Sequence, residues 1–556
     1  MNRRSVLRTA IGVAGAAAMA PLLSACGAGS AAKAGANTKA GLASALPDYV
    51  PSSAVTADIP SVVGANSALS DPGFLSWPAK PAASVASIPG SGGSYSSITP
   101  LWGTIPSANN QYYQAMNKAL GANITVQPAN GVTYATAIPP IIAAKKLPDW
   151  IQIPGWMASG FNLAELCGTQ LADLTPYLAG SAVKEYPNLA AVAPGAWQAG
   201  IWDDKLYGIP TFFSAEAFAG QFYYRGDVFE AKGISASEVS SIDDFYALGA
   251  ELTDAKNKVW AFDSLSYTYL YQPFGISTQF TVAGGKLVHQ FEQPEFLEML
   301  AWAYKLAKSG YVHPDALAGD TNDAKTRFYA GQSVITGDGM GAWDAADAQA
   351  GIAAGKSYRR ESFPLFAADG TTTPMIALSN SAGMFSYLNK KLTPSQIREC
   401  LRIADYLAAP FGTVEYAMVN FGVEGVDYTM VNGVPTYTSA GQSNVQQQTY
   451  PFLATPTNVV YNPGFDQITK DRCAWTAGAG KFAYKPVFWN MNITVPDQFT
   501  VANAAQAVVD TITDIQNGKQ PVSAFQSALS TWKNSGGDAM VGWYQDSILA
   551  KYGTGQ

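Results

Sequence analysis

The sequence predicts an α/β fold of two or more lobes with mostly parallel sheets. Its 556 residues are too many for one compact core. Hydrophobic residues make up 48% of the chain and charged residues only 13%, so there is ample material for buried cores. From residue 98 onward, segments typical of strands alternate with segments of helical spacing, as they do in doubly wound sheets.

Residues 1–25 have the three parts of an export signal: a basic start, a short apolar run and small residues before Cys26. The apolar run is shorter than the ~20 residues that a transmembrane helix needs. The pair Arg3 and Arg4 resembles a twin-arginine signal, and an ordinary basic start for the general export route is the alternative. Leu-Ser-Ala-Cys at residues 23–26 resembles a bacterial lipobox. We therefore expect Cys26 to carry a lipid that anchors the exported protein to the outer face of the cell membrane.

Residues 26–95 are rich in Ala, Gly, Ser and Pro and show no helical or strand periodicity. This composition predicts a lipidated flexible tether with an end-to-end distance of ~45 Å. Phe74, Leu75 and Trp77 are the exception, because they are apolar residues that could dock on the folded body.

The folded body is expected to begin with alternating strands and helices. These are a strand at residues 98–102, a helix at 111–120, a strand at 124–127, a helix at 134–145 and a strand at 149–153. Ligands of doubly wound lobes bind beyond the carboxyl ends of the strands. Trp102 and Trp156 follow predicted strands and would lie at that edge.

The charge of the chain excludes one class of partner. The 34 Lys and Arg against 41 Asp and Glu give a net charge of −7, and removal of residues 1–25 would take away three arginines and bring it near −10. Such a chain has no excess of positive charge to attract the phosphate groups of a nucleic acid, so nucleic-acid binding is not expected.

Residues for catalysis or metal binding are scarce. His289 and His313 are the only histidines, and each is expected to be structural. No Gly-x-Ser-x-Gly elbow occurs, and two distant histidines with scattered cysteines make a poor zinc set, so we expect no catalytic residue, no metal and no cofactor. Cys167, Cys400 and Cys473 are odd in number and would form at most one disulfide.

Aromatic residues are in excess, with 13 Trp, 28 Tyr and 25 Phe. A sugar ring has an apolar face and a rim of hydroxyls, so its site combines flat aromatic surface with a few fixed polar groups. Most aromatic residues lie in cores, but those that follow a predicted strand or turn are better placed to face a ligand. The ligand-binding candidates are Trp102, Trp156, Phe212, Phe213, Trp343, Trp475 in a predicted loop, Trp489 and Asn490.

Several short motifs follow one another in a fixed order. They are DKLYGIP at residues 204–210, QFYYRGD at 221–227, IDDF at 242–245, GYVHPDAL at 310–317, RFYAGQ at 327–332 and NFGVEGVDY at 420–428. In this order the sequence resembles the extracellular solute-binding proteins, family 1, of ABC importers. The last motif is similar to the lipoprotein branch associated with oligosaccharides such as aldouronates and alginate.

The resemblance implies two doubly wound lobes of the periplasmic-binding-protein-like fold, type II, joined by a hinge and closing on a carbohydrate in the cleft. Lobe 1 would comprise residues 96–214 and 378–490, lobe 2 residues 215–377, and residues 491–556 would form helices that pack on the lobes. A membrane permease and an ATPase are the implied partners. Relatives often hold calcium in an Asp- and Asn-rich loop, but residues 253–259 offer too few oxygen donors, so no calcium site is carried over.

The expected function is therefore that of a lipid-anchored, monomeric receptor without catalytic activity. It would capture a carbohydrate by closure of its hinge, and an oligosaccharide is the favoured kind. Two alternatives stay open. One is a cell-surface glycoside hydrolase or lyase that uses carboxylates in the same cleft, and the other is a glycan-binding adhesin or sensor without transport.

Overall fold

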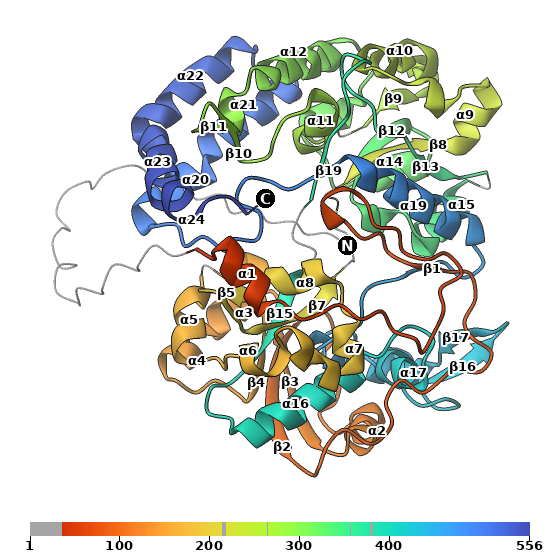
Figure 1. Cartoon of the computed structure of the whole chain (residues 1–556). Coiled ribbons are helices and arrows are strands. Elements are labelled where there is room, and N and C mark those ends of the chain that lie inside the picture. The colour runs from red at the N-terminus through yellow and green to blue at the C-terminus, as the bar shows by residue number, and fades with distance from the viewer. Residues whose placement is uncertain are drawn as a thin grey trace, which may run out of the picture.

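Two β-sheets, one in each lobe, organise the chain in a computed structural model (Figure 1). The structure describes residues 36–158, 160–213, 218, 220–263, 265–355, 357–378 and 382–555. Lobe 1 is the lower half of Figure 1 and lobe 2 the upper half. The predicted α/β fold of two lobes is confirmed.

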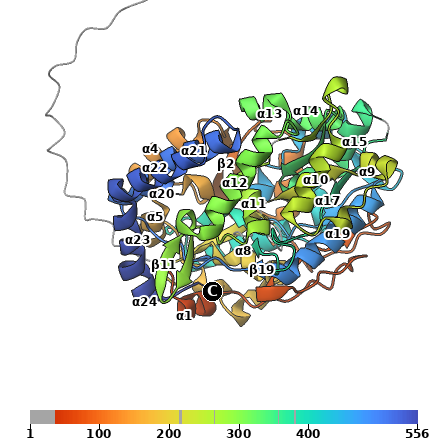
Figure 2. The same cartoon turned by 90° about the horizontal axis from the view of Figure 1, so that it is seen from above.

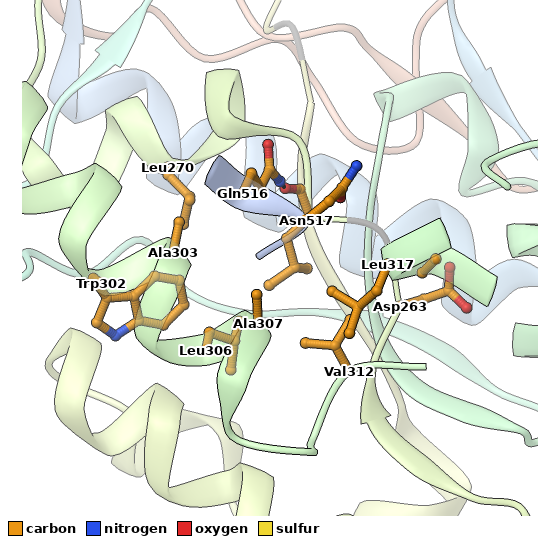
Figure 3. A pocket seen from close by; sticks show the side chains of 12 residues that line it. Asp263, Leu270, Trp302, Ala303, Leu306, Ala307, Val312, Leu317, Gln516 and Asn517 are labelled. Carbon is orange, nitrogen blue, oxygen red and sulfur yellow. Dashed lines mark hydrogen bonds between the residues drawn. The ribbon is translucent and has the colours of Figure 1, made fainter. Parts of the chain in front are cut away.

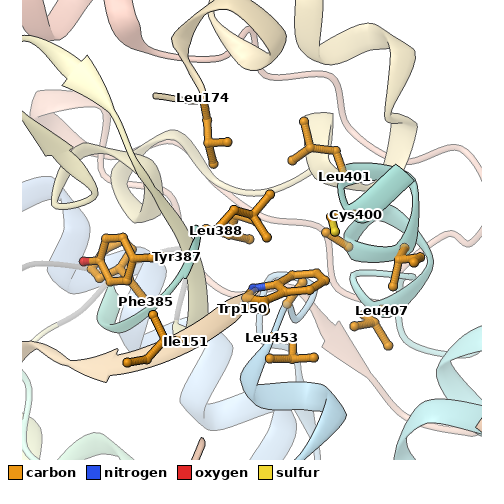
Figure 4. Packing of buried hydrophobic residues seen from close by; sticks show 14 of the residues in the cluster. Trp150, Ile151, Leu174, Phe385, Tyr387, Leu388, Cys400, Leu401, Leu407 and Leu453 are labelled. Atoms are coloured by element: carbon orange, nitrogen blue, oxygen red, sulfur yellow. The ribbon is translucent and has the colours of Figure 1, made fainter. Parts of the chain in front are cut away.

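The sheet of lobe 1 has the strand order β3-β2-β4-β15-β7. Its strands are β2 (Ser94–Leu101), β3 (Asn123–Asn130), β4 (Trp150–Pro154), β7 (Gly208–Phe213) and β15 (Ala382–Leu388). Helix α16 (Pro394–Leu407) packs on this sheet, and Figure 4 shows Trp150 of β4 beside Leu388 of β15 and Cys400 of α16. These side chains are fully buried and form the core of lobe 1.

The sheet of lobe 2 has the strand order β13-β8-β12-β9. Its strands are β8 (Gln221–Arg225), β9 (Trp260–Phe262), β12 (Ser333–Asp338) and β13 (Arg360–Ser362). The helices around it include α10 (Ile242–Leu252), α11 (Tyr267–Phe274) and α12 (Pro294–Lys308) (Figure 2). Phe245 and Phe262 are fully buried between α10 and the sheet.

Both sheets are mixed, so the expectation of mostly parallel sheets is wrong. Strand β15 begins where the chain returns from lobe 2, at the edge of the sheet where β4 and β7 end. It therefore runs antiparallel to both of these strands. Strand β8 likewise begins where the chain arrives from lobe 1, and it runs antiparallel to β12. The parallel pairs are β2 with β3, β2 with β4, and β12 with β9.

The first predicted elements agree with the structure except for one helix. Helix α2 (Gln111–Leu120) is confirmed at both ends, because the Asn110 side chain accepts from the Tyr113 N–H and Gly121 ends the helix with a φ of 62°. The predicted helix at residues 134–145 is instead two short helices, α3 (Tyr134–Ala137) and α4 (Pro139–Ala143). The proline pair at residues 139–140 interrupts the predicted helix, since proline lacks the backbone N–H that would continue the helical hydrogen bonds.

Residues 36–95 are packed on the folded body, so the predicted flexible tether is wrong for this part of the chain. Helix α1 (Lys39–Ala45) buries Leu42 and Ala45 against lobe 1. Phe74 and Trp77 dock against Phe411, as expected. A segment of small residues is held here by backbone hydrogen bonds and a few docked aromatic rings, which its composition does not reveal. Residues 1–35, with Cys26, lie outside the described residues.

Residues 462–555 lie largely on lobe 2. Helix α19 (Asp466–Ala479) contacts lobe 2 through Trp475, whose Nε1 donates to Phe363 O at 2.8 Å, although residues 378–490 were expected to belong to lobe 1. The chain has already reached lobe 2 at Asn462, whose Oδ1 accepts from the Ala345 N–H. Helices α21 (Gln506–Gln516) and α22 (Ser523–Trp532) bury their apolar faces in the core of lobe 2, beside α12 (Figure 2).

Two further observations concern the described residues alone. None of their helices has the length and apolar character needed to cross a membrane. Cys167, Cys400 and Cys473 are buried free thiols, so they form no disulfide with one another.

Candidate functional site

The loops after three neighbouring parallel strands of lobe 1 present an exposed apolar surface. Trp102 follows β2, Val132 follows β3 and Trp156 follows β4. Trp102 is 39% exposed and Trp156 is 64% exposed, and their ring centroids lie 6.0 Å apart. Ile105 and Val132 are also exposed. We call Trp102, Val132 and Trp156 the lobe 1 platform. Large apolar side chains gathered on a surface mark a site of interaction.

The platform is held in place by its surroundings. The Trp102 N–H donates to Gln448 Oε1 at 2.5 Å, and Thr99 Oγ1 donates to Gln448 O at 2.7 Å. The indole of Trp102 lies directly against Gly131, where an added Cβ would come within 2.5 Å of the ring. Only glycine allows this close approach. Gln448 therefore holds the backbone of Trp102, and Gly131 gives its ring a place to pack.

Lobe 2 has a polar pocket of about 410 Å³ at the carboxyl end of β12. Its lining includes Tyr269, Asn322, Lys325 and Asp338. Lys325 Nζ lies 3.8 Å from Asp338 Oδ2, and the buried Arg360 approaches the same oxygen at 3.3 Å. Burial, with a smaller effect of the Asp338 charge, raises the pKa of Tyr269. The pocket thus offers hydroxyl, amide, ammonium and carboxylate groups with nearly balanced charge.

Trp343 and Trp475 are occupied by packing. Trp343 is only 3% exposed and stacks edge-on against Tyr223, with ring centroids 5.7 Å apart. Trp475 lies in α19 and not in the predicted loop, and its Nε1–H is bonded to Phe363 O. The local sequence did not distinguish a turn-flanking tryptophan that is buried from one that faces solvent.

Trp489 and Asn490 lie together, apart from the platform. Lys485 Nζ lies 4.7 Å from the centroid of the Trp489 ring. Asn490 is buried, and its Nδ2 donates to Gln198 Oε1 at 2.5 Å. This contact joins segments of the two lobes, so Asn490 has a structural partner. Its role as a ligand-binding residue stays a prediction.

Phe212 and Phe213 are the last residues of β7, next to where the chain leaves lobe 1. Phe213 pairs with Ala382 of β15 through the backbone. Their side chains lie outside what the structure describes. Of the six candidates whose side chains the structure describes, Trp102 and Trp156 lie together on the platform, and Trp475 and Trp489 pack against one buried cluster that includes Ile376 and Leu378.

Sequence reasoning missed Val132, Tyr269, Lys325 and Asp338. For two of them a signal was available. Val132 lies two residues after the end of β3, as Trp156 lies two residues after the end of β4. Asp338 ends a strand at a Gly-Asp-Gly turn.

Two other hollows differ in character from the polar pocket. A cavity of about 30 Å³ in lobe 2 is lined by Leu270, Trp302 and Leu306 with Asp263 at one end (Figure 3), and it has room for little more than a water molecule. A pocket of about 510 Å³ lies between residues 49–74 and lobe 1, and its lining is mostly apolar.

The described ranges were also compared with the requirements of a metal site. No three side chains of His, Cys, Asp or Glu gather there in a way that could hold a metal ion. His289 is buried among aromatic rings, and burial lowers its pKa to about 4. His313 accepts from the Asp315 N–H at the start of a short helix. Asp254, in the segment considered above for calcium, is bonded to Asn257.

Comparisons with known proteins agree with this architecture. The family model described as "Bacterial extracellular solute-binding protein" matches residues 102–382. The chain is 22% identical over 469 residues to Lipoprotein LipO of Bacillus subtilis (strain 168), covering 78% of this chain and 88% of the relative.

Two solved structures share the fold at low identity. The HMO binding ABC-transporter associated solute binding protein from Bifidobacterium longum infantis ATCC 15697 has a TM-score of 0.61 and 14% identity, covering 83% of this chain and 99% of its own. The N-glycan transport solute binding protein NgtS from Streptococcus pneumoniae has a TM-score of 0.59 and 15% identity, covering 83% of this chain and 100% of its own.

Proposed function

Because this chain belongs to the family of bacterial extracellular solute-binding proteins, we propose that it is the substrate-binding receptor of an ABC importer. Its ligand is a carbohydrate that is captured between the two lobes, and an oligosaccharide is the favoured kind. The observation that carries this proposal is the exposed pair of Trp102 and Trp156 at the carboxyl ends of β2 and β4. NgtS is an N-glycan transport protein and the Bifidobacterium protein is HMO binding, which supports the same ligand class.

The chemistry of the two lobes suits a sugar. The rings of Trp102 and Trp156 supply flat apolar surface for the apolar face of a pyranose. The pocket with Asn322, Lys325 and Asp338 supplies donors and acceptors for hydroxyl groups. Since Lys325 and Asp338 neutralise each other, an uncharged oligosaccharide suits the site better than a long polyanion.

Capture proceeds by closure of the hinge. A sugar that touches the lobe 1 platform and the lobe 2 pocket at once favours the closed arrangement, because only that arrangement makes both sets of contacts. The permease then recognises the closed form. Small-angle scattering with and without saturating sugar tests this step, since superimposable profiles would indicate a rigid adhesin or sensor.

Trp102→Ala and Trp156→Ala are each expected to weaken sugar binding by about 2 to 4 kcal/mol, the effect of losing a binding hot spot. A thermal-shift screen against neutral and acidic oligosaccharides identifies the sugar, because binding at a hundred times Kd stabilises by ~2.7 kcal/mol. Calorimetric titration with that sugar then measures both variants. Tyr49→Ala is the control, because Tyr49 is equally exposed at 39% but lies on residues 49–74. Unchanged affinity in both tryptophan variants would exclude the platform as the sugar site.

The proposal includes no turnover of the ligand. Members of the family are binding proteins. Chromatography of the sugar after prolonged incubation should return it unchanged, whereas shortened or unsaturated products would identify a glycoside hydrolase or lyase.

Attachment to the outer face of the cell membrane through a lipid on Cys26 completes the proposal, supported by the lipobox and by the lipoprotein relative. Cys26→Ala should release the protein into the soluble fraction or leave the precursor uncleaved. Cys473→Ala, which changes a buried cysteine, should partition to membranes as the wild type does. A Cys26→Ala protein that is processed and stays in the membrane would contradict the lipid anchor.

A further inference from the structure

The N-terminal segment, defined here as residues 36–95, contacts both lobes. Near its start, Asn37 is buried at a junction of three parts of the chain. Its Nδ2 donates to Ile201 O of lobe 1 at 2.7 Å, and its Oδ1 accepts from the Asp204 N–H at 3.1 Å. Its own N–H donates to Met491 O at 2.9 Å. Met491 is part of the apolar core of lobe 2, so Asn37 is bonded to both lobes at once.

Two more asparagines cross between the lobes at the same junction. Asn490 Nδ2 donates to Gln198 Oε1 of lobe 1 at 2.5 Å. Asn492 Nδ2 donates to Ala199 O at 2.9 Å and to Ile201 O at 2.7 Å. Both asparagines have a positive φ, of 57° and 48°, a conformation that asparagine tolerates better than most residues.

Helix α1 is attached to this junction at its first turn. The Thr38 N–H and Oγ1–H donate to the two carboxylate oxygens of Asp204 at 2.7 Å and 2.9 Å. Asp204 lies in the tight turn between β5 (Ile201–Trp202) and β6 (Lys205–Leu206) of lobe 1. Figure 1 shows α1 between the two lobes.

The middle of the segment covers the connection between the lobes. Asn66 Nδ2 donates to Ala483 O at 2.8 Å, and Gly64 lies so close to Gly480 that an added Cβ would come within 2.5 Å of its carbonyl oxygen. Ala68 is buried in one cluster with Ile376 and Leu378, beside the point where the chain returns to lobe 1.

The end of the segment is bound to lobe 1 alone. The Ser84 N–H and Oγ–H donate to Glu415 Oε2 at 2.9 Å and 3.1 Å. Glu415 lies in α17 (Val414–Phe421), and the segment then continues into β2. The segment therefore runs from the junction of the lobes to their connection and back to lobe 1.

We propose that the N-terminal segment is a brace that limits how far the two lobes can separate. The donors and acceptors at Asn37, Asn490 and Asn492 belong to different lobes, so a relative movement of the lobes must stretch or break these bonds. Without these hydrogen bonds, only the segments that connect the two lobes would restrain their relative movement. The brace keeps the unliganded protein within a narrow range of lobe angles, which raises the fraction ready to close on a ligand. Only this last consequence rests on the proposed function.

Asn37→Ala in the otherwise complete mature protein, without any sugar, tests the brace. Amide hydrogen exchange of residues 198–206 and 487–492 should become about tenfold faster, as expected for the loss of buried hydrogen bonds. The radius of gyration from small-angle scattering should increase. Ser84→Ala is the matched control, because it removes side-chain bonds of the same segment within lobe 1 and should leave exchange at residues 198–206 unchanged.

Should Asn37→Ala fail to fold, Asp204→Asn serves in its place. Asparagine keeps the left-handed backbone of this turn but removes the charge that accepts from Thr38, so a smaller change in the same direction is expected. Exchange and radius of gyration identical to the wild type would overturn the brace. Since no sugar is used, this outcome is distinguishable from a failure of the sugar site, which the Trp102 and Trp156 variants test.

Discussion

Replacing Arg327 with methionine is expected to destabilise the protein by about 3 to 5 kcal/mol. Arg327 lies in α14 (Ala324–Tyr329) and is buried, and its Nε and Nη2 donate to the two carboxylate oxygens of Asp263 at 2.7 Å and 2.8 Å. Asp263 is buried directly after β9. Methionine fills most of the volume but leaves this carboxylate in the interior without its cation. Urea unfolding followed by tryptophan fluorescence measures the loss.

The matched control for Arg327 is Arg359→Met. Arg359 also pairs with two carboxylates, those of Glu230 and Glu361, but it is half exposed. Exposed ion pairs contribute about 1 kcal/mol or less. Equal losses in the two variants would contradict a specific role for burial. Because α14 also carries Lys325 of the polar pocket, Arg327→Met should in addition weaken sugar binding.

Wild-type protein is expected to lose roughly 3 kcal/mol of stability between pH 5 and pH 8 through one residue, Asp405. Asp405 is buried in α16 and accepts from the Asn188 and Leu189 N–H groups at 2.7 Å and 3.0 Å. Burial raises its pKa from 3.8 to about 7, the backbone bonds oppose this shift, and the nearby Glu415 adds to it. Since the folded pKa is above the unfolded one, the contribution is complete below about pH 4. It declines as the pH rises and is lost above about 7.

Asp405→Asn isolates this effect, because asparagine keeps an acceptor for the two backbone N–H groups and does not ionise. The free energy of unfolding of the variant, relative to that of the wild type, should rise by roughly 3 kcal/mol between pH 5 and pH 8. Asp244→Asn is the control. Hydrogen bonds from Ser240 and Ser241 lower the Asp244 pKa, so its titration lies below this range and its difference from wild type should stay constant. A constant difference for Asp405→Asn as well would show that Asp405 is ionised throughout.

Elements with a strong local signal could be predicted from the sequence. Helix α2 has apolar residues at helical spacing and a cap at each end, so both of its boundaries were predictable. The placement of Trp102 and Trp156 after strands was predictable for the same reason. Trp343 and Trp475 carry similar local patterns, yet Trp343 is buried against Tyr223 and Trp475 lies in a helix. Exposure depends on what packs against a side chain, and a local pattern does not contain that information.

The sequence by itself determined the α/β class, the order of the first strands and the resemblance to the solute-binding family, because each depends on short segments read in order. Only the tertiary structure decided that residues 36–95 are a packed segment. Ser84 and Glu415 are 331 positions apart, and Asn37 reaches Met491 across most of the chain. Such contacts form when the folded lobes bring distant backbone groups within hydrogen-bonding distance. A segment of small residues with no periodicity of its own is ordered by the surface that it meets.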